Sequence, residues 1–204
     1  MLMRTFSVAT LAALSLAIAS SSWAGDFAKG QEAYNMGDYE TALAEWLPLA
    51  EEGNAEGQFG VGLLYANGFG VPMDDAEALK WYQAAAEQGH GEAQCNLAVM
   101  HANGWGVPQS DEEAMKWYGM AADQGVTEAQ NYLSEMYSLG FAVPQDNVKS
   151  HMWLTIAAAL GDFGATYKID EVARNMTAAE VAESEGLAAA WLESHPDLQA
   201  NEQP

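Results

Sequence analysis

The sequence predicts an all-α fold, a solenoid built from antiparallel helix pairs. The first observation is a period of 36 residues, which brings Gly53 into register with Gly89, Gly125 and Gly161. A Val-Pro step in a glycine-rich loop and a Trp-Tyr pair return with the same period. Periods between about 20 and 50 residues are typical of stacked repeat units. We therefore divide the chain into residues 1–24, an N-terminal helix pair at 25–53, three repeats at 54–89, 90–125 and 126–161, and a C-terminal part at 162–204.

The first 24 residues are typical of a secretory signal peptide. Arg4 precedes an apolar run from Val8 to Ile18, and Ser22-Trp23-Ala24 supplies small residues at the −3 and −1 positions of a cleavage site. The apolar run is shorter than the roughly 20 residues of a membrane span. We expect export, cleavage near Ala24, no membrane insertion of the product, and a location in the periplasm or outside the cell.

Residues 26–53 predict one helix pair. Apolar residues recur at helical spacing on both sides of Met36-Gly37-Asp38. Asp38 is placed to cap the second helix by accepting backbone N–H bonds. This pair lacks the Gly-x-Gly-Val-Pro loop of the later units, and we expect it to form the N-terminal end of the stack.

The three repeats share one design. Their first helices are expected over residues 55–67, 91–103 and 127–139. Each of these helices ends at a glycine that can take positive φ, namely Gly68, Gly104 and Gly140. The Val-Pro step after it stiffens the loop, because proline fixes its own φ and restricts the residue before it.

The second helices are expected to begin at Asp74, Ser110 and Asp146. Asp74 with Glu77, and Ser110 with Glu113, have the spacing of a capping box. The third repeat has Lys149 in the glutamate position, so we expect a weaker cap there.

Large aromatic residues lie beside alanines in the second helices. Trp81, Trp117 and Trp153 occupy equivalent positions, and this alternation of large and small side chains predicts interlocking of adjacent helix pairs. The alternative is an aromatic box for a cofactor. Cys95 is the single cysteine, for which we expect a packing role, with an intermolecular disulfide or a reactive thiol as the alternative.

The repeat pattern weakens after Gly161. Residues 165–176 predict another helix with Tyr167, Ile169 and Val172 on its apolar side. Thr177 and Glu180 form a further capping box before a last helix that ends near Glu193. We expect this part to cap the stack, with a frayed tail from His195 to Pro204.

The chain is strongly acidic. Its formal net charge is −22, from 29 acidic and 7 basic residues, and removing Arg4 with the signal peptide leaves 6 basic residues and a charge of −23. Such a surface repels phosphates and anionic lipids, which argues against nucleic acid and membrane surfaces as partners. The charge favours neutral or basic partners and a soluble monomer, and it has the simpler explanation of keeping a helical array soluble.

No arrangement typical of catalysis, of a cofactor or of a metal site is present in the sequence. The histidines, His90, His101, His151 and His195, lie in four segments without a histidine or cysteine at metal-ligand spacing. His101 stands in a core-lining position. Phosphate-binding loops, serine elbows and nucleotide fingerprints are absent. We therefore expect a protein that is not an enzyme.

The second repeat carries the motif that is most informative about family. It contains Glu92-Ala93-Gln94, Leu97-Ala98, Gly104-Trp105-Gly106-Val107-Pro108, Trp117-Tyr118 and Ala121-Ala122-Asp123-Gln124-Gly125. This motif resembles the Sel1-like repeat family, a subgroup of the tetratricopeptide-like solenoids, over roughly residues 26–161. The resemblance implies a right-handed α–α superhelix that binds proteins or peptides without chemistry of its own.

We expect a periplasmic or secreted adaptor that holds a partner on its concave face, lined by the first helices. Amide groups can bind a peptide backbone, and carboxylates favour basic partners. The exposed candidates for this role are Gln58, Gln94, Asn96, Gln130, Tyr132, Glu56, Glu92 and Glu128, and solvated helix positions are the alternative explanation. The resemblance also suggests two other functions. The first is the β-lactam binding or hydrolysis of cysteine-rich secreted members, whose cysteine pairs this chain lacks, and the second is a structural role in an envelope export assembly.

Overall fold

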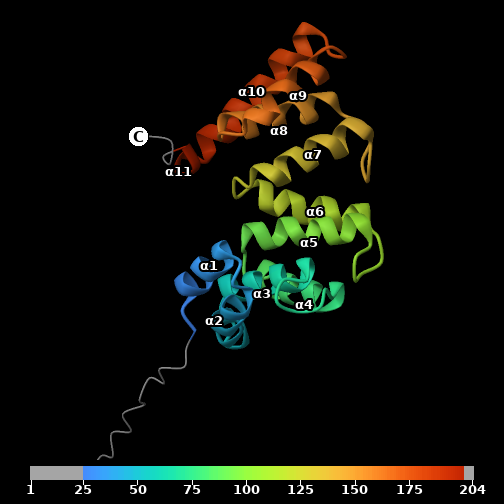
Figure 1. Cartoon of the computed structure of the whole chain (residues 1–204). Coiled ribbons are helices and arrows are strands. Elements are labelled where there is room, and N and C mark those ends of the chain that lie inside the picture. The colour runs from blue at the N-terminus through green and yellow to red at the C-terminus, as the bar shows by residue number, and fades with distance from the viewer. Residues whose placement is uncertain (1–24, 200–204) are drawn as a thin grey trace, which may run out of the picture.

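The structure, a computed structural model, describes residues 25–199, and all regular secondary structure in that range is helical. The proposed signal peptide at 1–24 lies outside the described residues. The helices are α1 (Phe27–Met36), α2 (Tyr39–Glu51), α3 (Ala55–Asn67), α4 (Asp75–Ala86), α5 (Gly91–Asn103), α6 (Asp111–Ala122), α7 (Thr127–Leu139), α8 (Asn147–Ala159), α9 (Phe163–Ala173), α10 (Ala178–Ser194) and α11 (Pro196–Gln199). They form an elongated stack in which each helix from α1 to α8 packs against the next (Figure 1).

The repeat design predicted from the sequence is confirmed in the helix bounds. Helices α3, α5 and α7 cover the expected residues, and each is closed by a glycine in the left-handed conformation whose N–H bonds to a carbonyl of the last turn. The N-terminal pair α1 and α2 is also present, and Asp38 accepts the N–H of Thr41 at the start of α2.

The second helices begin with only half of the expected capping boxes. Asp74 and Ser110 do accept the N–H groups of Glu77 and Glu113. The N–H groups of these two cap residues, however, donate to carbonyls of the preceding first helix, and the two glutamates pair with Lys80 and Lys116. The complete box forms at Thr177 and Glu180, as expected. The third cap keeps its bond, from the Lys149 N–H to Asp146 at 3.0 Å.

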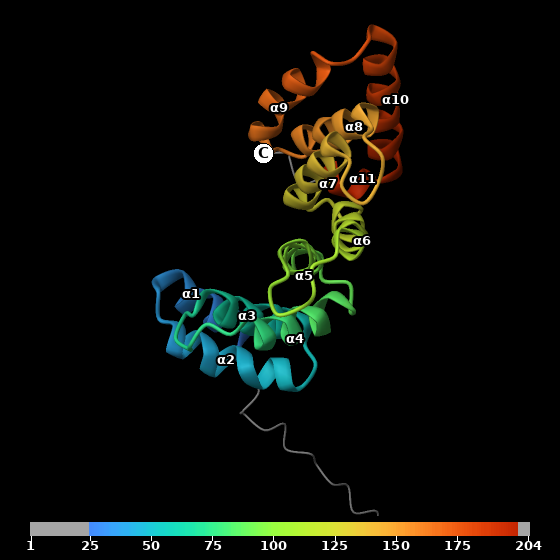
Figure 2. The same cartoon turned by 90° about the vertical axis from the view of Figure 1, so that its right-hand side faces the viewer.

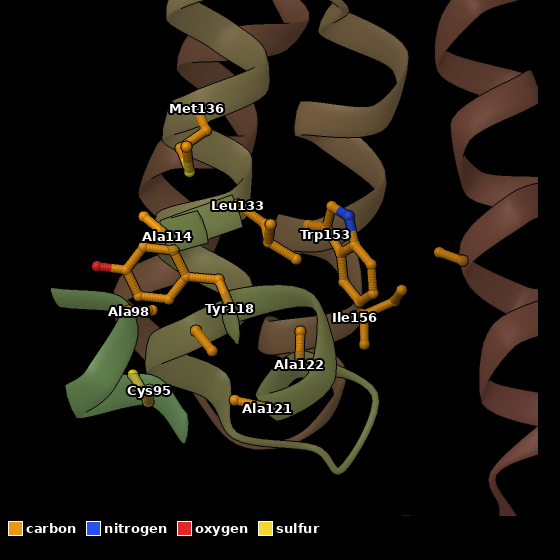
Figure 3. Close-up of a cluster of buried hydrophobic side chains, with 12 residues drawn as sticks. Cys95, Ala98, Ala114, Tyr118, Ala121, Ala122, Leu133, Met136, Trp153 and Ile156 are labelled. Atoms are coloured by element: carbon orange, nitrogen blue, oxygen red, sulfur yellow. The ribbon is translucent and has the colours of Figure 1, made fainter. Parts of the chain in front are cut away.

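One buried column of large side chains runs through the stack. Trp46, Tyr82, Tyr118 and Leu154 stand 36 residues apart, and each is at most 3 % exposed. Small residues lie against this column. Gly62 is an example: a Cβ added to it would stand 2.7 Å from the Tyr82 ring, which is too close for a larger side chain. Alanines of α6 complete the cluster around Tyr118 (Figure 3). Close packing of large against small side chains therefore fixes how neighbouring pairs sit together.

The tryptophan column lies next to this one and is less deeply buried. Trp153 is buried, whereas Trp81 and Trp117 are half-buried. Each contacts apolar residues of the preceding unit, as expected for packing between repeats. Lys80 and Lys116 lie over the rings of Trp81 and Trp117, at 4.8 and 5.3 Å from the ring centroids. This geometry fits a packing role and gives no support to the aromatic-box alternative.

The C-terminal helices depart from the expectation in two ways. Tyr167 is 82 % exposed, so its assignment to the apolar side of α9 was wrong, although Ile169 and Val172 do pack on α8. The reason is that α9 and α10 both pack mainly against α8 rather than against each other, which leaves the outer side of α9 uncovered (Figure 2). The tail expected to be frayed contains the short helix α11, whose Leu198 lies against Gly125.

The two kinds of helix lie on opposite sides of the stack. Figure 2 shows α5, α7 and α9 on one side and α6, α8 and α10 on the other. We call the surface formed by α3, α5 and α7 the first-helix face. Over residues 25–199, no helix has the length and apolarity that crossing a membrane requires.

Candidate protein-binding surface

All eight residues predicted to bind a partner lie on α3, α5 and α7. The structure separates them into two groups. Glu56, Glu92 and Glu128 are exposed, and Asn96 and Tyr132 are half-buried. The expected exposure of the three glutamines is wrong, because Gln58, Gln94 and Gln130 are 7 %, 1 % and 0 % exposed.

The glutamines are buried because they close the ends of preceding helices. The Nε2 atoms of Gln58, Gln94 and Gln130 donate to the carbonyls of Ala50, Ala86 and Ala122 at 3.3, 3.0 and 3.1 Å. These carbonyls lie in the last turns of α2, α4 and α6, where helices leave acceptors without internal partners. The Nε2 group in this position therefore joins one repeat to the next and is not available to a ligand.

A second glutamine completes this link in two of the three repeats. Gln88 donates to the Oε1 of Gln58, and Gln124 donates to the Oε1 of Gln94, both at 2.7 Å. The equivalent position in the third repeat is Leu160, which has no donor. The Oε1 of Gln130 is correspondingly buried without a hydrogen-bond partner. An unpartnered buried amide oxygen costs about 1–3 kcal/mol.

The exposed glutamates stand in the first turns of their helices. Carboxylates there interact favourably with the positive end of the helix dipole. Glu56 also lies 3.2 Å from the Nε2 of His90, whose Nδ1 accepts the N–H of Ala93. His90 thus caps α5 and contacts the preceding repeat.

Three equivalent cavities lie along the first-helix face. Successive first helices are separated enough to leave a cavity between α3 and α5 of about 320 Å³, one between α5 and α7 of about 300 Å³, and one between α7 and α9 of about 440 Å³. Shifting the lining of the first by 36 residues reproduces nearly all of the second, and a further shift reproduces most of the third. The residues at their base are Tyr82, Tyr118 and Leu154. We call these the repeat cavities.

Two aromatic residues at the cavity rims were missed in the sequence analysis. Trp105 and Phe141 follow the glycines that end α5 and α7, and they are 50 % and 48 % exposed. The equivalent Phe69 is half-buried, because it stacks on Tyr39 with ring centroids 4.4 Å apart. Exposed aromatic side chains beside a cavity are typical of binding surfaces. The signal available in the sequence was the aromatic column in the Gly-x-Gly loops.

The rims of the cavities are acidic. Asp75, Asp111, Glu135 and Glu171 line them, and the one basic lining residue is Lys168 of α9, in the third cavity. Burial raises the pKa of Tyr132, and the nearby Glu128 and Glu135 carboxylates add to the shift. The surface therefore attracts positively charged groups.

Cys95 is placed for packing. It is 2 % exposed in the cluster around Tyr118 (Figure 3), and burial raises the pKa of its thiol to about 12. A thiol that stays protonated and covered is a poor nucleophile. The structure favours the packing role over the disulfide or reactive alternatives.

The described residues offer little for catalysis. Within 25–199, no group of three or more histidine, cysteine or acidic side chains is arranged to hold a metal ion. The closest serine–histidine pair is Ser184 and His151, with Oγ and Nδ1 2.7 Å apart. Both side chains are buried between α10 and α8, where no substrate reaches them.

Comparison with known families accounts for the repeat. A model of the Sel1 repeat matches residues 55–90, 91–126 and 127–162, which together are more than half of the chain. The chain belongs to the Sel1 repeat family. Sel1 repeats form helical solenoids that generally serve as scaffolds for protein–protein interaction, which agrees with the fold class predicted from the sequence.

Two solved structures are similar over most of the chain. A Sel1 repeat protein from Oxalobacter formigenes is 31 % identical, with a TM-score of 0.66 over 71 % of this chain and 59 % of that one. The protein c5321, a protective antigen of uropathogenic Escherichia coli strains that displays an SLR fold, is 26 % identical, with a TM-score of 0.54 over 86 % of this chain and 46 % of that one. This chain thus spans about half of the length of the two. No curated protein sequence gives a significant match.

Proposed function

We propose that this Sel1 repeat chain is a non-catalytic, exported scaffold that holds an extended segment of a partner protein along its first-helix face. The observation that carries the proposal is the repetition of one cavity between successive first helices. A row of equivalent cavities suits a ligand that is itself periodic, and an extended peptide presents side chains at regular intervals.

The chemistry of the cavities specifies the kind of segment. Tyr82 and Tyr118 at the base and Trp105 and Phe141 at the rim favour apolar or aromatic side chains. The acidic rims favour lysine or arginine beside them. The proposed partner segment therefore alternates apolar and basic residues, and its binding weakens with salt because exposed charges are screened.

A capture experiment with matched variants tests the proposal. The mature chain, 25–204, is immobilised and exposed to envelope extract at low and moderate salt. We expect capture of a defined partner that is lost on the combined Trp105→Ala and Phe141→Ala change. It should be retained with Met120→Ala, which removes an exposed side chain from α6 on the opposite side. Equal capture by both variants, or capture that is insensitive to salt, contradicts the proposal.

Export and the absence of chemistry are tested separately. Cell fractionation followed by N-terminal sequencing is expected to give a mature chain that begins at Gly25. A nitrocefin assay on that chain is expected to show no turnover above background. Turnover would favour the β-lactam hydrolysing alternative, and a full-length protein in the cytoplasm would contradict export.

A further inference from the structure

A fourth cavity, larger than the repeat cavities, lies at the C-terminal end of the first-helix face. It measures about 550 Å³ between α7 and the start of α9. We call it the terminal cavity. It is lined by Thr127, Glu128, Asn131, Tyr132, Glu135, Leu160, Gly161, Asp162 and Lys168.

The terminal cavity exists because three positions depart from the repeat pattern. Leu160, Asp162 and Lys168 stand where the preceding repeat has Gln124, Val126 and Tyr132. In the preceding repeat, Val126 and Gln124 lie against Gly91, so that a Cβ added to Gly91 would be 2.9 Å from Val126. The same region of the third repeat is open.

Negative charge exceeds positive charge in the terminal cavity. Glu128, Glu135 and Asp162 contribute three carboxylates, against the one ammonium of Lys168. That ammonium donates to the Oδ1 of Asn131 at 3.1 Å, and the Asn131 amide donates in turn to Asp162. The lysine is thus held by a neutral side chain, and its own side chain is exposed and free to move aside.

A buried acceptor without a partner belongs to Gln130, the neighbour in sequence of the cavity-lining Asn131. The equivalent oxygen of Gln94 bonds to the residue thirty positions later, which is Gln124. For Gln130 that residue is Leu160, and Leu160 lines the cavity. By this equivalence Leu160 separates the Oε1 of Gln130 from the cavity, and that oxygen is fully buried and unsatisfied. A donor entering past the partly exposed Leu160 side chain would satisfy it.

We propose that the terminal cavity holds the guanidinium group of an arginine side chain. Asp162 already accepts the N–H groups of Gly164 and Ala165 as the cap of α9, so the carboxylates open to a ligand are those of Glu128 and Glu135. A guanidinium has five N–H donors in one plane, which suits these two carboxylates and an amide oxygen better than the three donors of an ammonium do. Tyr132 is stacked on Tyr118, with centroids 4.8 Å apart, and it lines the cavity, where a guanidinium plane can stack on an aromatic ring. The inference rests on the proposed function for the source of the arginine, which is the partner segment.

Titration with small probes tests the cavity without a partner. Acetyl-arginine amide and acetyl-lysine amide are added to the isotopically labelled mature chain, and amide shifts are followed by NMR. We expect saturable shifts at Gln130, Tyr132 and Leu160 with the arginine probe, and at least fivefold weaker binding of the lysine probe. Equal binding of the two probes, or shifts that do not saturate, would overturn the proposal.

Variants then assign the binding to named groups. Glu128→Gln with Glu135→Gln should weaken the arginine probe at least tenfold, whereas Glu92→Gln, the equivalent of Glu128 one repeat earlier, should leave it unchanged. Leu160→Gln supplies an internal donor to Gln130 and should weaken binding of the arginine probe at least fivefold. Circular dichroism verifies that this variant keeps its fold. Lys168→Gln should tighten binding of the arginine probe, because it removes the positive charge from the cavity. An equal loss with Glu92→Gln, or no loss with Leu160→Gln, would overturn the assignment.

The outcomes separate this inference from the proposed function. Probe binding without a partner on the first-helix face would sustain the terminal cavity and refute the scaffold proposal. A partner captured through Trp105 and Phe141, with no binding of the arginine probe, would sustain the scaffold proposal and refute the arginine site in the terminal cavity.

Discussion

At the scale of single residues, the glutamine links between repeats make the clearest stability prediction. Leu160→Gln places an amide where Gln88 and Gln124 stand in the earlier repeats and provides a donor for the Oε1 of Gln130. We expect a gain of about 1 kcal/mol in the free energy of unfolding. Urea denaturation of the mature chain measures it.

The reverse change is the matched control. Gln124→Leu removes the donor to Gln94, whose Oε1 then becomes buried and unpaired. We expect a loss of about 1–3 kcal/mol. If Leu160→Gln destabilised the chain while Gln124→Leu left it unchanged, the linking role of these amides would be refuted.

The same glutamines show where reasoning from the sequence is weakest. Their polarity and their position on a first helix predicted exposure to solvent. The structure instead buries them, with hydrogen bonds to the carbonyls of Ala50, Ala86 and Ala122. A repeated polar residue serves a bond between repeats as readily as a ligand. Which carbonyl lies within reach of each amide is set by how the repeats pack on one another.

At the scale of helices, glycine positions report how closely pairs approach. Gly62 in α3 faces the ring of Tyr82, and an added Cβ would lie 2.7 Å from it. Gly62→Ala forces the ring or the helix to move, and we expect a loss of about 1–3 kcal/mol.

A second helical glycine gives the control. Gly119 in α6 has nothing within 4 Å of an added Cβ. Gly119→Ala should therefore stabilise the chain by up to about 1 kcal/mol, because alanine is the better helix former. Thermal unfolding followed by circular dichroism compares the two variants, and effects of the same sign would contradict the packing described for α3 and α4.

The docking of α10 on α8 makes stability depend on pH. Burial lowers the pKa of His151, with Glu185 opposing the shift, and its Nδ1 lies 2.7 Å from the Oγ of Ser184 on α10. The unfolded chain, with a histidine pKa of about 6.5, then binds more protons than the folded chain as the pH falls. Stability present above pH 6.5 is lost below it.

Urea unfolding at pH 7.5, 6.5 and 5.5 measures this loss. We expect a decline of up to about 1.4 kcal/mol per pH unit below 6.5, absent in His151→Gln. Hydrogen bonds lower the pKa of some carboxylates, such as Glu45 and Glu180, from their ordinary value of 4.5. Protonating these groups also destabilises the folded chain, but only at pH values below about 4.5. A decline of equal slope in the variant would assign the effect to other groups.

At the scale of the whole molecule, periodicity determines what the sequence reveals. The 36-residue register predicted the solenoid, the bounds of α3, α5 and α7, and the packing of Trp81, Trp117 and Trp153 between repeats, because packing against neighbours must recur in every unit. Departures from the register were harder to interpret. The exposed Tyr167 follows from the packing of α9 and α10 on α8 rather than on each other, and the terminal cavity follows from the departures at Leu160, Asp162 and Lys168.

The candidate binding surface was predicted only in outline. The first helices and the acidic character were available from the sequence, and the exposed glutamates lie there as expected. Predicting the cavities would require the distance between successive first helices. That distance depends on helix crossing angles, which no local sequence pattern encodes. The sequence contains Trp105 and Phe141, but it does not indicate that their side chains are exposed beside a cavity.

The central claim is that a partner protein lies on the first-helix face. Photo-cross-linking in the native cell, with the cross-linker placed at Tyr132 on α7 or at the exposed Gln83 on α4, tests it most directly. We predict one defined protein adduct from position 132 that is weakened by salt, and none from position 83. An adduct from position 83 alone, or no adduct from either position, would contradict the claim.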